Sequence, residues 1–422
     1  MSKLRMIPLA SDKISTRTLS RRRFLKCTTA SVTLLGVSPL VLRGAPGANE
    51  RIRIGMIGTG DRAQALLAEI IKVAKAENVQ ITAICDVWKK NRDATAAKIE
   101  RAFGAAPQMF SKFEDLLALK DVDAVTIATP DFGHAPILIA ALEAGKDVYV
   151  EKPMSLDLDA ANRALDLARA KKAVVQVGTQ RRSEGKCIAA AREIASGVLG
   201  KISRFSVGMH FNHARWARPY EDCQEADVDW PAFLLGKGPR PFDTKLIRRW
   251  QLYRFCTNGI AGLWLPHYAD LVCLLTGAKY PTRGVSLGGN FVWHDGREHS
   301  DTFHTVLEYP EGFLFDFAMS LGNTAGTHCT VHGTDATLDV EAATTTPEGG
   351  TKDKPVEVKK IGAAPETSHM ANWLQCIRSR ELPVADIQFG QQHTVAVVMS
   401  ALAFETGLRH RYDAASRTVV PG

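Results

Sequence analysis

Short apolar runs alternate with amphipathic stretches along residues 51–178, and glycine or polar loops separate them. Runs of this length suit strands that are buried on both faces of a parallel sheet. The amphipathic stretches predict helices that cover the sheet, so we expect a doubly wound α/β domain over residues 50–180. The predicted strands are 52–57, 79–85, 124–128, 148–150 and 174–177, with a short further segment at 108–110.

The pattern changes after a predicted helix at 184–196. Stretches with strand-like composition and hairpin signals follow, which predict an α+β domain over 181–422 with a large, mostly antiparallel sheet. We expect a surface excursion at 341–366 and two closing helices, 370–378 and 391–408. An open sheet offers a face for self-association, so we expect a homo-oligomer. The predicted strands of this domain are 202–209, 285–293, 303–309, 313–319 and 328–332.

The first strand runs directly into a glycine turn and then a helix, which is the order that a dinucleotide site needs. Gly58 permits the tight turn, Gly60 lets the backbone approach a pyrophosphate, and Ala63 keeps helix and strand close. The free N–H groups at the start of the helix would face the phosphates. The turn therefore predicts a Rossmann-type NAD site. Its other candidate cofactor contacts are Thr59, Asp61 and Arg62.

Asp86 ends the second predicted strand, roughly where an acidic residue binds the adenosine ribose. The alternative is that Asp86 only caps the next helix. An acid at this position favours NAD over NADP, because a 2′-phosphate would meet a negative charge. Lys89, Lys90 and Arg92 lie close enough to keep NADP possible.

Ligands of doubly wound sheets bind beyond the carboxyl ends of the strands. Several side chains follow directly after predicted strands and become candidate cofactor contacts for that reason. They are Thr129, Pro130, His134, Glu151, Lys152 and Gln180.

The formal charge of +8 belongs to the first 49 residues. These hold nine of the 53 Lys and Arg and one of the 45 Asp and Glu, which leaves 44 of each in the rest. Nothing in the charge therefore indicates a nucleic-acid partner for residues 50–422. The 422 residues exceed what one core usually holds, so two domains are expected.

Residues 20–26 read S-R-R-R-F-L-K, the form of a twin-arginine export signal. The apolar stretch at 28–42 is too short and too broken by Gly36 and Pro39 to span a membrane. Residues 1–49 are thus predicted to be a signal peptide of an exported, periplasmic protein. The seven cysteines beyond it form no C-x-x-C pair, which argues against a disulfide framework and against a zinc or other metal site.

The chain resembles the Gfo/Idh/MocA oxidoreductases, which include glucose–fructose oxidoreductase and inositol dehydrogenases, over nearly all of residues 51–422. The most specific likeness is E-K-P directly after a buried strand. The resemblance implies that Lys152 lies beside the nicotinamide and the reacting hydroxyl, with Glu151 and Pro153 fixing its position. A lysine ammonium there can stabilise negative charge on the substrate oxygen. The residues that carry the likeness are Gly58-Thr59-Gly60, Asp86, Thr129-Pro130, Glu151-Lys152-Pro153 and 178–182.

The family's second catalytic piece usually reads D-x-x-x-H-x-x-D on a helix. Here His267 and Asp270 match, but Leu263 stands where the family often has the first aspartate. The departure puts the usual acid–histidine relay in question. His267 remains the candidate general acid/base, since imidazole changes charge near neutral pH, with a core histidine as the alternative.

Further candidates for substrate binding are Arg181, Tyr253 and Asp270, together with an aromatic and basic cluster around Trp216 that would suit stacking on a sugar. The alternative for each of these residues is a role in packing rather than in substrate binding.

Three functions follow from these residues. The first is an exported, NAD-dependent enzyme that moves hydride between a tightly bound cofactor and a sugar or cyclic polyol. The second is a glycosidase that works by transient oxidation and elimination, and the third is a binding protein without chemistry.

Overall fold

The computed structural model describes residues 51–351 and 354–422. These residues belong to one compact unit. The predicted signal peptide, residues 1–49, lies outside them. Within the described residues, no helix is both long enough and apolar enough to cross a membrane.

The first sheet has six parallel strands in the order β3-β2-β1-β4-β5-β6. The order reverses beside β1, which creates the crevice where doubly wound sheets bind ligands. The predicted Rossmann-type sheet is confirmed. Its strands are β1 (Ile52–Ile57), β2 (Val79–Cys85), β3 (Gln108–Phe110), β4 (Ala124–Ile127), β5 (Asp147–Val150) and β6 (Val175–Val177).

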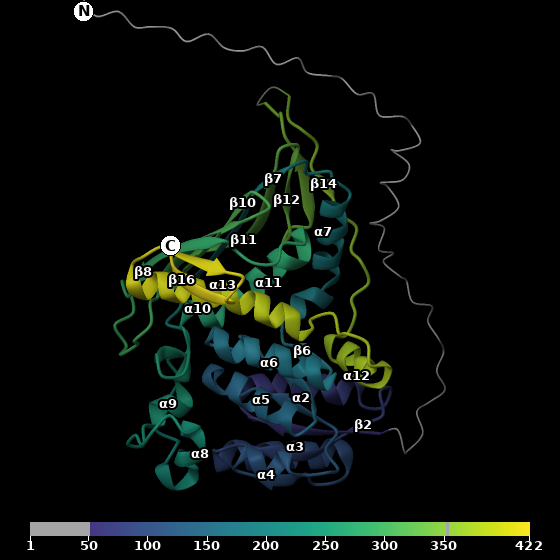
Figure 1. The fold of residues 1–422 in the computed structure, drawn as a ribbon, viewed down its shortest axis with the longest axis vertical. Helices are drawn as coiled ribbons and strands as arrows, with labels where there is room; N and C mark the ends of the chain where they lie inside the picture. The colour runs from purple at the N-terminus through teal and green to yellow at the C-terminus, as the bar shows by residue number, and fades with distance from the viewer. Residues whose placement is uncertain (1–50, 352–353) are drawn as a thin grey trace, which may run out of the picture. The chain divides into compact units, whose positions relative to one another are not determined.

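Helices cover both faces of this sheet (Figure 1). Side chains of α2, α3 and α12 pack on one face, and those of α4, α5 and α6 pack on the other. The helices are α2 (Asp61–Val73), α3 (Lys89–Phe103), α4 (Phe113–Leu117), α5 (His134–Glu143), α6 (Leu158–Lys171) and α12 (His369–Ser379).

The second sheet has ten strands in the order β14-β13-β12-β11-β7-β10-β9-β8-β15-β16. Only the β10–β7 pair is parallel, so the predicted antiparallel character is confirmed. Its strands are β7 (Ile202–Asn212), β8 (Arg283–Gly289), β9 (Thr302–Tyr309), β10 (Phe313–Ser320), β11 (Gly322–Gly333), β12 (Ala336–Asp339), β13 (Thr344–Pro347), β14 (Lys359–Lys360), β15 (His410–Asp413) and β16 (Thr418–Pro421).

Several element bounds differ from the sequence-based expectation, and β15 and β16 were not predicted. The strand predicted at 285–293 ends at Gly289, because the backbone N–H groups of residues 291–293 donate to the Asp301 carboxylate instead. The excursion predicted at 341–366 contains β13, which pairs with β12 and extends the sheet.

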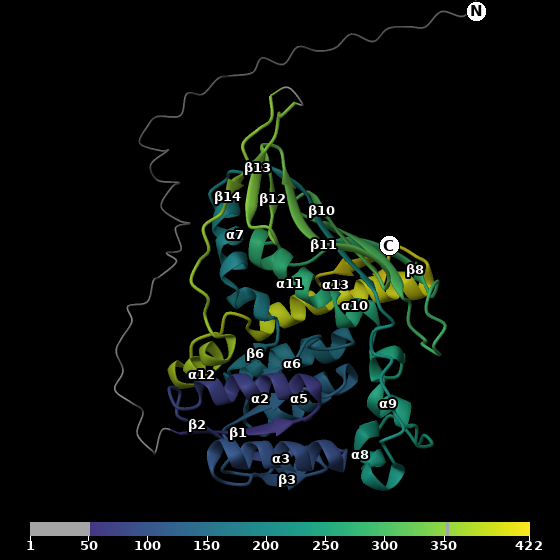
Figure 2. The same ribbon diagram turned by 180° about the vertical axis from the view of Figure 1, so that it is seen from behind.

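A long helix, α13 (Ile387–Thr406), joins the two sheets. It packs on β8 and β15 of the second sheet and on α6 and β6 of the first (Figures 1 and 2). One continuous apolar core therefore holds Val125 of the first sheet together with Phe205 and Phe315 of the second. The remaining helices are α7 (Gly185–Ala195), α8 (Trp230–Leu234), α9 (Thr244–Arg248), α10 (Ile260–Leu263) and α11 (Leu265–Thr276).

Candidate functional site

A cavity of about 400 Å³ lies beyond the carboxyl ends of the first sheet. This volume is within the range of small-molecule and cofactor sites. Both the first sheet and the segment that precedes α11 line it, so one cavity gathers most of the predicted site. The predicted residues that line it are Gly58, Gly60, Asp61, Arg62, Asp86, Thr129, Pro130, His134, Glu151, Lys152, Gln180 and His267.

The glycine turn is shaped as a phosphate site requires. Gly58 has φ +80°, and a Cβ there would lie 2.7 Å from the backbone of Ala128. At Gly60 a Cβ would meet only Asn91, at 3.9 Å, so the space above this residue is open to the cavity. No side chain caps the start of α2, which leaves its first N–H groups free for an anion.

Asp86 anchors this turn. Its Oδ2 accepts hydrogen bonds from the Thr59 N–H (2.7 Å) and hydroxyl (2.8 Å), and its Oδ1 accepts one from the Trp88 N–H (2.8 Å). Thr59 is buried and acts through Asp86 rather than lining the cavity. Burial raises the pKa of Asp86, while the bonds from Trp88 and Thr59 oppose the rise. Since each carboxylate oxygen accepts about two bonds, Oδ1 retains capacity for a ribose hydroxyl.

The basic residues after Asp86 are engaged elsewhere. Lys90 Nζ pairs with Asp222 Oδ2 at 2.8 Å, and Lys89 pairs with Asp93. Arg92 Nη1 donates to the backbone oxygen of Asp86 at 2.9 Å. Lys89 and Lys90 thus have carboxylate partners of their own, whereas Arg92 stays beside Asp86.

Glu151 links the loop after β5, which carries Lys152, to the start of α2. It is 3% exposed, and its Oε1 accepts from Arg62 Nε at 2.6 Å and from Gln180 Nε2 at 3.3 Å. Gly178 leaves room for it, since a Cβ there would lie 2.6 Å from Oε1. Arg62 keeps one buried nitrogen, Nη2, without a partner among the described residues. A buried donor of this kind fits a cofactor acceptor in the cavity.

Lys152 extends into the cavity and is fixed from the second domain. Its Nζ donates to the backbone oxygen of Leu263 at 2.8 Å, which leaves donors free for a substrate. The Lys152–Pro153 peptide bond is cis. Burial lowers the pKa of Lys152, and the carboxylates of Asp131 and Glu151 oppose that shift and favour the ammonium form.

Asp131 is a cavity residue that the sequence analysis did not select as a site residue. It is 2% exposed, and its Oδ2 accepts from the Thr257 hydroxyl at 2.7 Å. Burial raises its pKa, and His134 and Lys152 are the first groups that oppose the rise. The signal was available, because Asp131 stands in the same loop after β4 as Thr129 and His134.

His267 lines the cavity at the start of α11 and is close enough to Lys152 for the ammonium to affect its pKa. Burial lowers the pKa of His267 well below 6.5, and the cations of Lys152, Arg181 and Arg62 lower it further. Its ring is therefore neutral near pH 7 and can accept a proton. Trp264 packs beside it, with ring centroids 6.2 Å apart.

His134 joins two strand-end loops. It is the first residue of α5 and is 1% exposed, with Nδ1 2.7 Å from the Pro153 oxygen and Nε2 2.9 Å from the Thr129 oxygen. It both lines the cavity and fixes the loop that carries Lys152.

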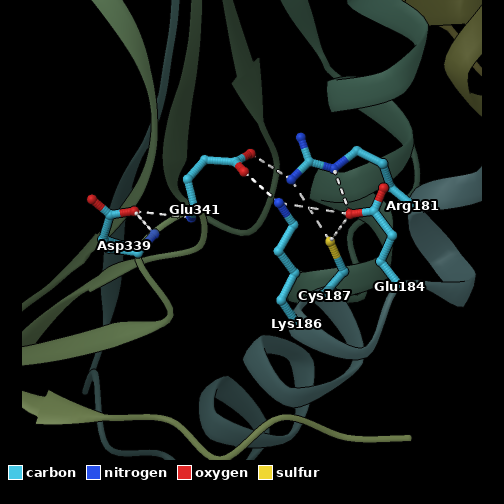
Figure 3. A network of polar contacts seen from close by, with 7 residues as sticks. Arg181, Glu184, Lys186, Cys187, Asp339 and Glu341 are labelled. Carbon is cyan, nitrogen blue, oxygen red and sulfur yellow. Dashed lines mark hydrogen bonds and ion pairs between the residues drawn. The ribbon is translucent and has the colours of Figure 1, made fainter. Parts of the chain in front are cut away.

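Three residues predicted for substrate binding do not line the cavity: Arg181, Tyr253 and Asp270. Arg181 binds Glu341 at 2.6 Å within a network that also contains Glu184 and Lys186 (Figure 3). Asp270 is 1% exposed and accepts from Arg182 Nε at 2.8 Å. These contacts support a structural role for Arg181 and Asp270.

The aromatic side of the cavity comes from beyond β7. Trp216 of the predicted cluster lines it, together with Phe233, Trp250 and Trp264. Sequence periodicity carries no signal for these rings, because they lie in loops and in short helices.

The fold and cavity define a dinucleotide-binding domain joined to a second domain built on an open sheet. Residues 52–179 match the Gfo/Idh/MocA family model, described as an oxidoreductase family with an NAD-binding Rossmann fold. This part of the chain thus matches the NAD-binding Rossmann domain of that family.

Part of the chain is also similar in sequence to proteins with names. The chain is 31% identical over 151 residues to inositol 2-dehydrogenase/D-chiro-inositol 3-dehydrogenase of Shouchella clausii, covering 36% of this chain and 42% of the relative. It is 28% identical over 229 residues to a glycosyl hydrolase family 109 protein of Saccharopolyspora erythraea, covering 49% of each. The chain thus aligns with less than half the length of either relative.

Solved structures extend the likeness beyond this domain. The WlbA dehydrogenase from Bordetella pertussis, in complex with NADH and UDP-GlcNAcA, superposes with a TM-score of 0.66 at 20% identity. The match covers 86% of this chain and 99% of that one, so the two share their overall fold.

Alanine at the two glycines should separate stability from cofactor affinity. Gly58→Ala should lower the free energy of unfolding by about 1–3 kcal/mol, because its Cβ collides with backbone at positive φ. Gly60→Ala should not destabilise the protein, but should weaken NADH binding roughly tenfold or more by filling the space that a pyrophosphate needs. Urea unfolding and NADH fluorescence titration measure the two effects. NADH binding to Gly60→Ala at wild-type affinity would contradict the site.

Proposed function

We propose that the protein is an NAD-dependent oxidoreductase that transfers hydride between the cofactor and a CH–OH group of a sugar or cyclic polyol. The observation that carries the proposal is one cavity that holds the glycine turn and Asp86 at one part and Lys152 with His267 at another. The first pair of features suits a dinucleotide, and the second suits an alcohol that loses a proton and a hydride.

Each side chain has a separate task in this reaction. A bound NAD would supply the hydride acceptor. Lys152, already held by the Leu263 carbonyl, donates a hydrogen bond to the substrate oxygen and stabilises the charge that develops there. His267, which is neutral, accepts the hydroxyl proton as the C=O bond forms. Aromatic rings such as Trp216 and Trp264 offer apolar faces to a sugar ring.

NAD is the proposed cofactor rather than NADP, because the buried Asp86 carboxylate would repel a 2′-phosphate, and the nearby Lys89 and Lys90 pair with other carboxylates. Tight retention of the cofactor is also proposed, since free NAD is scarce outside the cytoplasm. Absorbance after denaturation of protein purified without nucleotide tests this. Protein that releases no NAD(H) on denaturation would contradict tight retention of the cofactor.

Export to the periplasm rests on residues 20–26. Replacing Arg21 and Arg22 by lysine should keep the protein in the cytoplasm, as cell fractionation would show. Normal export of that variant would refute the signal.

We also expect a homo-oligomer through the open sheet, where Val285 and Leu287 are exposed. A monomeric mass in light scattering would contradict it.

A second candidate is glycoside cleavage by transient oxidation, in which the hydride returns within each turnover. The observation that favours it is the departure at Leu263, joined by the named glycosyl hydrolase relative. Oxidation of a hydroxyl acidifies the neighbouring C–H, which allows elimination before the hydride returns. Glycoside cleavage with catalytic NAD and deuterium exchange at C2 or C3 would select it. A requirement for stoichiometric NAD would select the dehydrogenase.

A non-catalytic binding protein ranks last, because Glu151, Lys152 and Pro153 are intact and Lys152 lies in the cavity. Sugars, glycosides and inositols soaked into crystals would identify the ligand class.

Lys152→Ala should divide binding from chemistry. It removes a donor to the reacting oxygen, so turnover should fall by roughly two to three orders of magnitude. NADH affinity should change far less, because the phosphate and ribose contacts lie elsewhere. Lys152→Arg should not restore turnover, since a forked guanidinium cannot take the position of the ammonium. Steady-state kinetics and NADH titration measure both, and more than about a tenth of wild-type turnover in the alanine variant would refute the assignment.

The pH profile of alcohol oxidation should report His267 and Lys152. His267 must be neutral to accept the proton, and its lowered pKa places the acid limb well below pH 6.5. Lys152 must be protonated to stabilise the oxyanion, and its lowered pKa places the alkaline limb below pH 10.5. His267→Ala should lower turnover and abolish the acid limb. An unchanged acid limb in this variant, measured from pH 4.5 to 10, would exclude His267 as the base.

A further inference from the structure

Residues 213–252, here called the covering segment, follow β7 of the second sheet. They extend to the first sheet, where they contact the loops after its strands. The covering segment contains α8 and α9, and α8 lies beside α3 in both views (Figures 1 and 2). Val228 forms an antiparallel bridge with Trp88, and the Asp229 N–H donates to the Val87 oxygen at 2.8 Å. The Ser111 hydroxyl donates to Asp229 Oδ2 at 2.7 Å. The covering segment is therefore docked on the loops that follow β2 and β3.

The covering segment also lines the cofactor cavity. Its side chains contact the same space as the glycine turn and Asp86, and they are mostly aromatic or apolar, with one cation. The residues are Trp216, Arg218, Ala232, Phe233, Leu235, Ile247, Trp250 and Gln251. Phe233 packs on Phe132 of the loop after β4, with centroids 5.4 Å apart, which fixes this side of the cavity to the first sheet.

The cation, Arg218, reaches the start of α2. Its Nη2 lies 3.1 Å from Oδ2 of Asp61, the first residue of that helix. Both side chains line the cavity, and Asp61 is 74% exposed at its side chain, so the ion pair is weakly held. The free N–H groups of α2 are where a dinucleotide places its phosphates. A guanidinium therefore already stands at the anion position, supplied from the other domain.

We infer that Arg218 is a ligand of the cofactor's pyrophosphate, delivered by the covering segment in exchange for its pair with Asp61. A planar guanidinium can give two parallel hydrogen bonds to a phosphate, whereas its pair with Asp61 is solvent-exposed and therefore weak. The covering segment thereby closes the dinucleotide site with a charge that no glycine motif encodes. The inference rests on the proposed cofactor, but not on the proposed sugar chemistry.

Binding titrations with NADH, ADP and adenosine test Arg218 without any turnover. Arg218→Gln should raise the dissociation constants of NADH and ADP roughly tenfold or more, and leave that of adenosine unchanged within about threefold. Asp61→Asn should tighten both diphosphates, because it removes the carboxylate that competes with the phosphates. Arg283→Gln is the matched control, since Arg283 forms an exposed pair with Glu308 at 2.6 Å in the second sheet. It should change none of the three constants.

The outcomes are separable. If Arg218→Gln binds ADP as tightly as the Arg283→Gln control, the inference is wrong. It is also wrong if Asp61→Asn and Arg218→Gln weaken ADP binding equally. Thermal unfolding checks the fold of each variant, and Arg218→Lys, which keeps the charge but loses the fork, should give an intermediate loss. Wild-type protein that binds NADH and ADP but oxidises no sugar or polyol would overturn only the proposed function. Failure of wild type to bind either nucleotide would overturn both.

Discussion

The ion pair between Arg62 and Glu151 is the contact on which the site depends. Arg62 lies at the start of α2 and Glu151 directly after β5, so their 2.6 Å contact ties the phosphate-binding turn to the loop that carries Lys152. Glu151 is 3% exposed, and a buried carboxylate without its partner is strongly destabilising. Gly178 makes the pair possible from a third strand end, because any side chain there would displace the carboxylate.

Charge balance around Lys152 follows from the same arrangement. Burial lowers the pKa of Lys152 and favours a neutral amine, while the carboxylates of Asp131 and Glu151 oppose this shift and favour the ammonium. The ammonium in turn helps to keep His267 neutral, since a second positive charge nearby is unfavourable. An ammonium at Lys152 and a neutral imidazole at His267 are the states that the proposed alcohol oxidation requires, and the charges around the two residues favour both.

Sequence reasoning succeeded where the signal is local. The strand, turn and helix around Gly58 and Gly60 are consecutive in the chain, as are β5 and Glu151-Lys152, so alternation and strand ends were enough to predict them. It also predicted the character of the second sheet from hairpin signals. It placed the end of β8 incorrectly because Asp301, which is distant in sequence, binds the N–H groups that would have continued the strand.

Reasoning from spacing was weakest for side chains whose partners are remote. Asp270 follows His267 by three residues, and that spacing permits one shared face, but Arg182 from another element draws Asp270 into the interior. The covering segment gave no periodic signal at all, so Arg218 could be found only from the three-dimensional structure.

At Leu263 the side chain departs from the family pattern, but the backbone still has a role. Its identity removes a carboxylate from the expected relay, yet its backbone oxygen positions Lys152, and Asp131 supplies negative charge from a different strand end. The chemistry at this position thus depends on backbone geometry, which a residue letter does not encode.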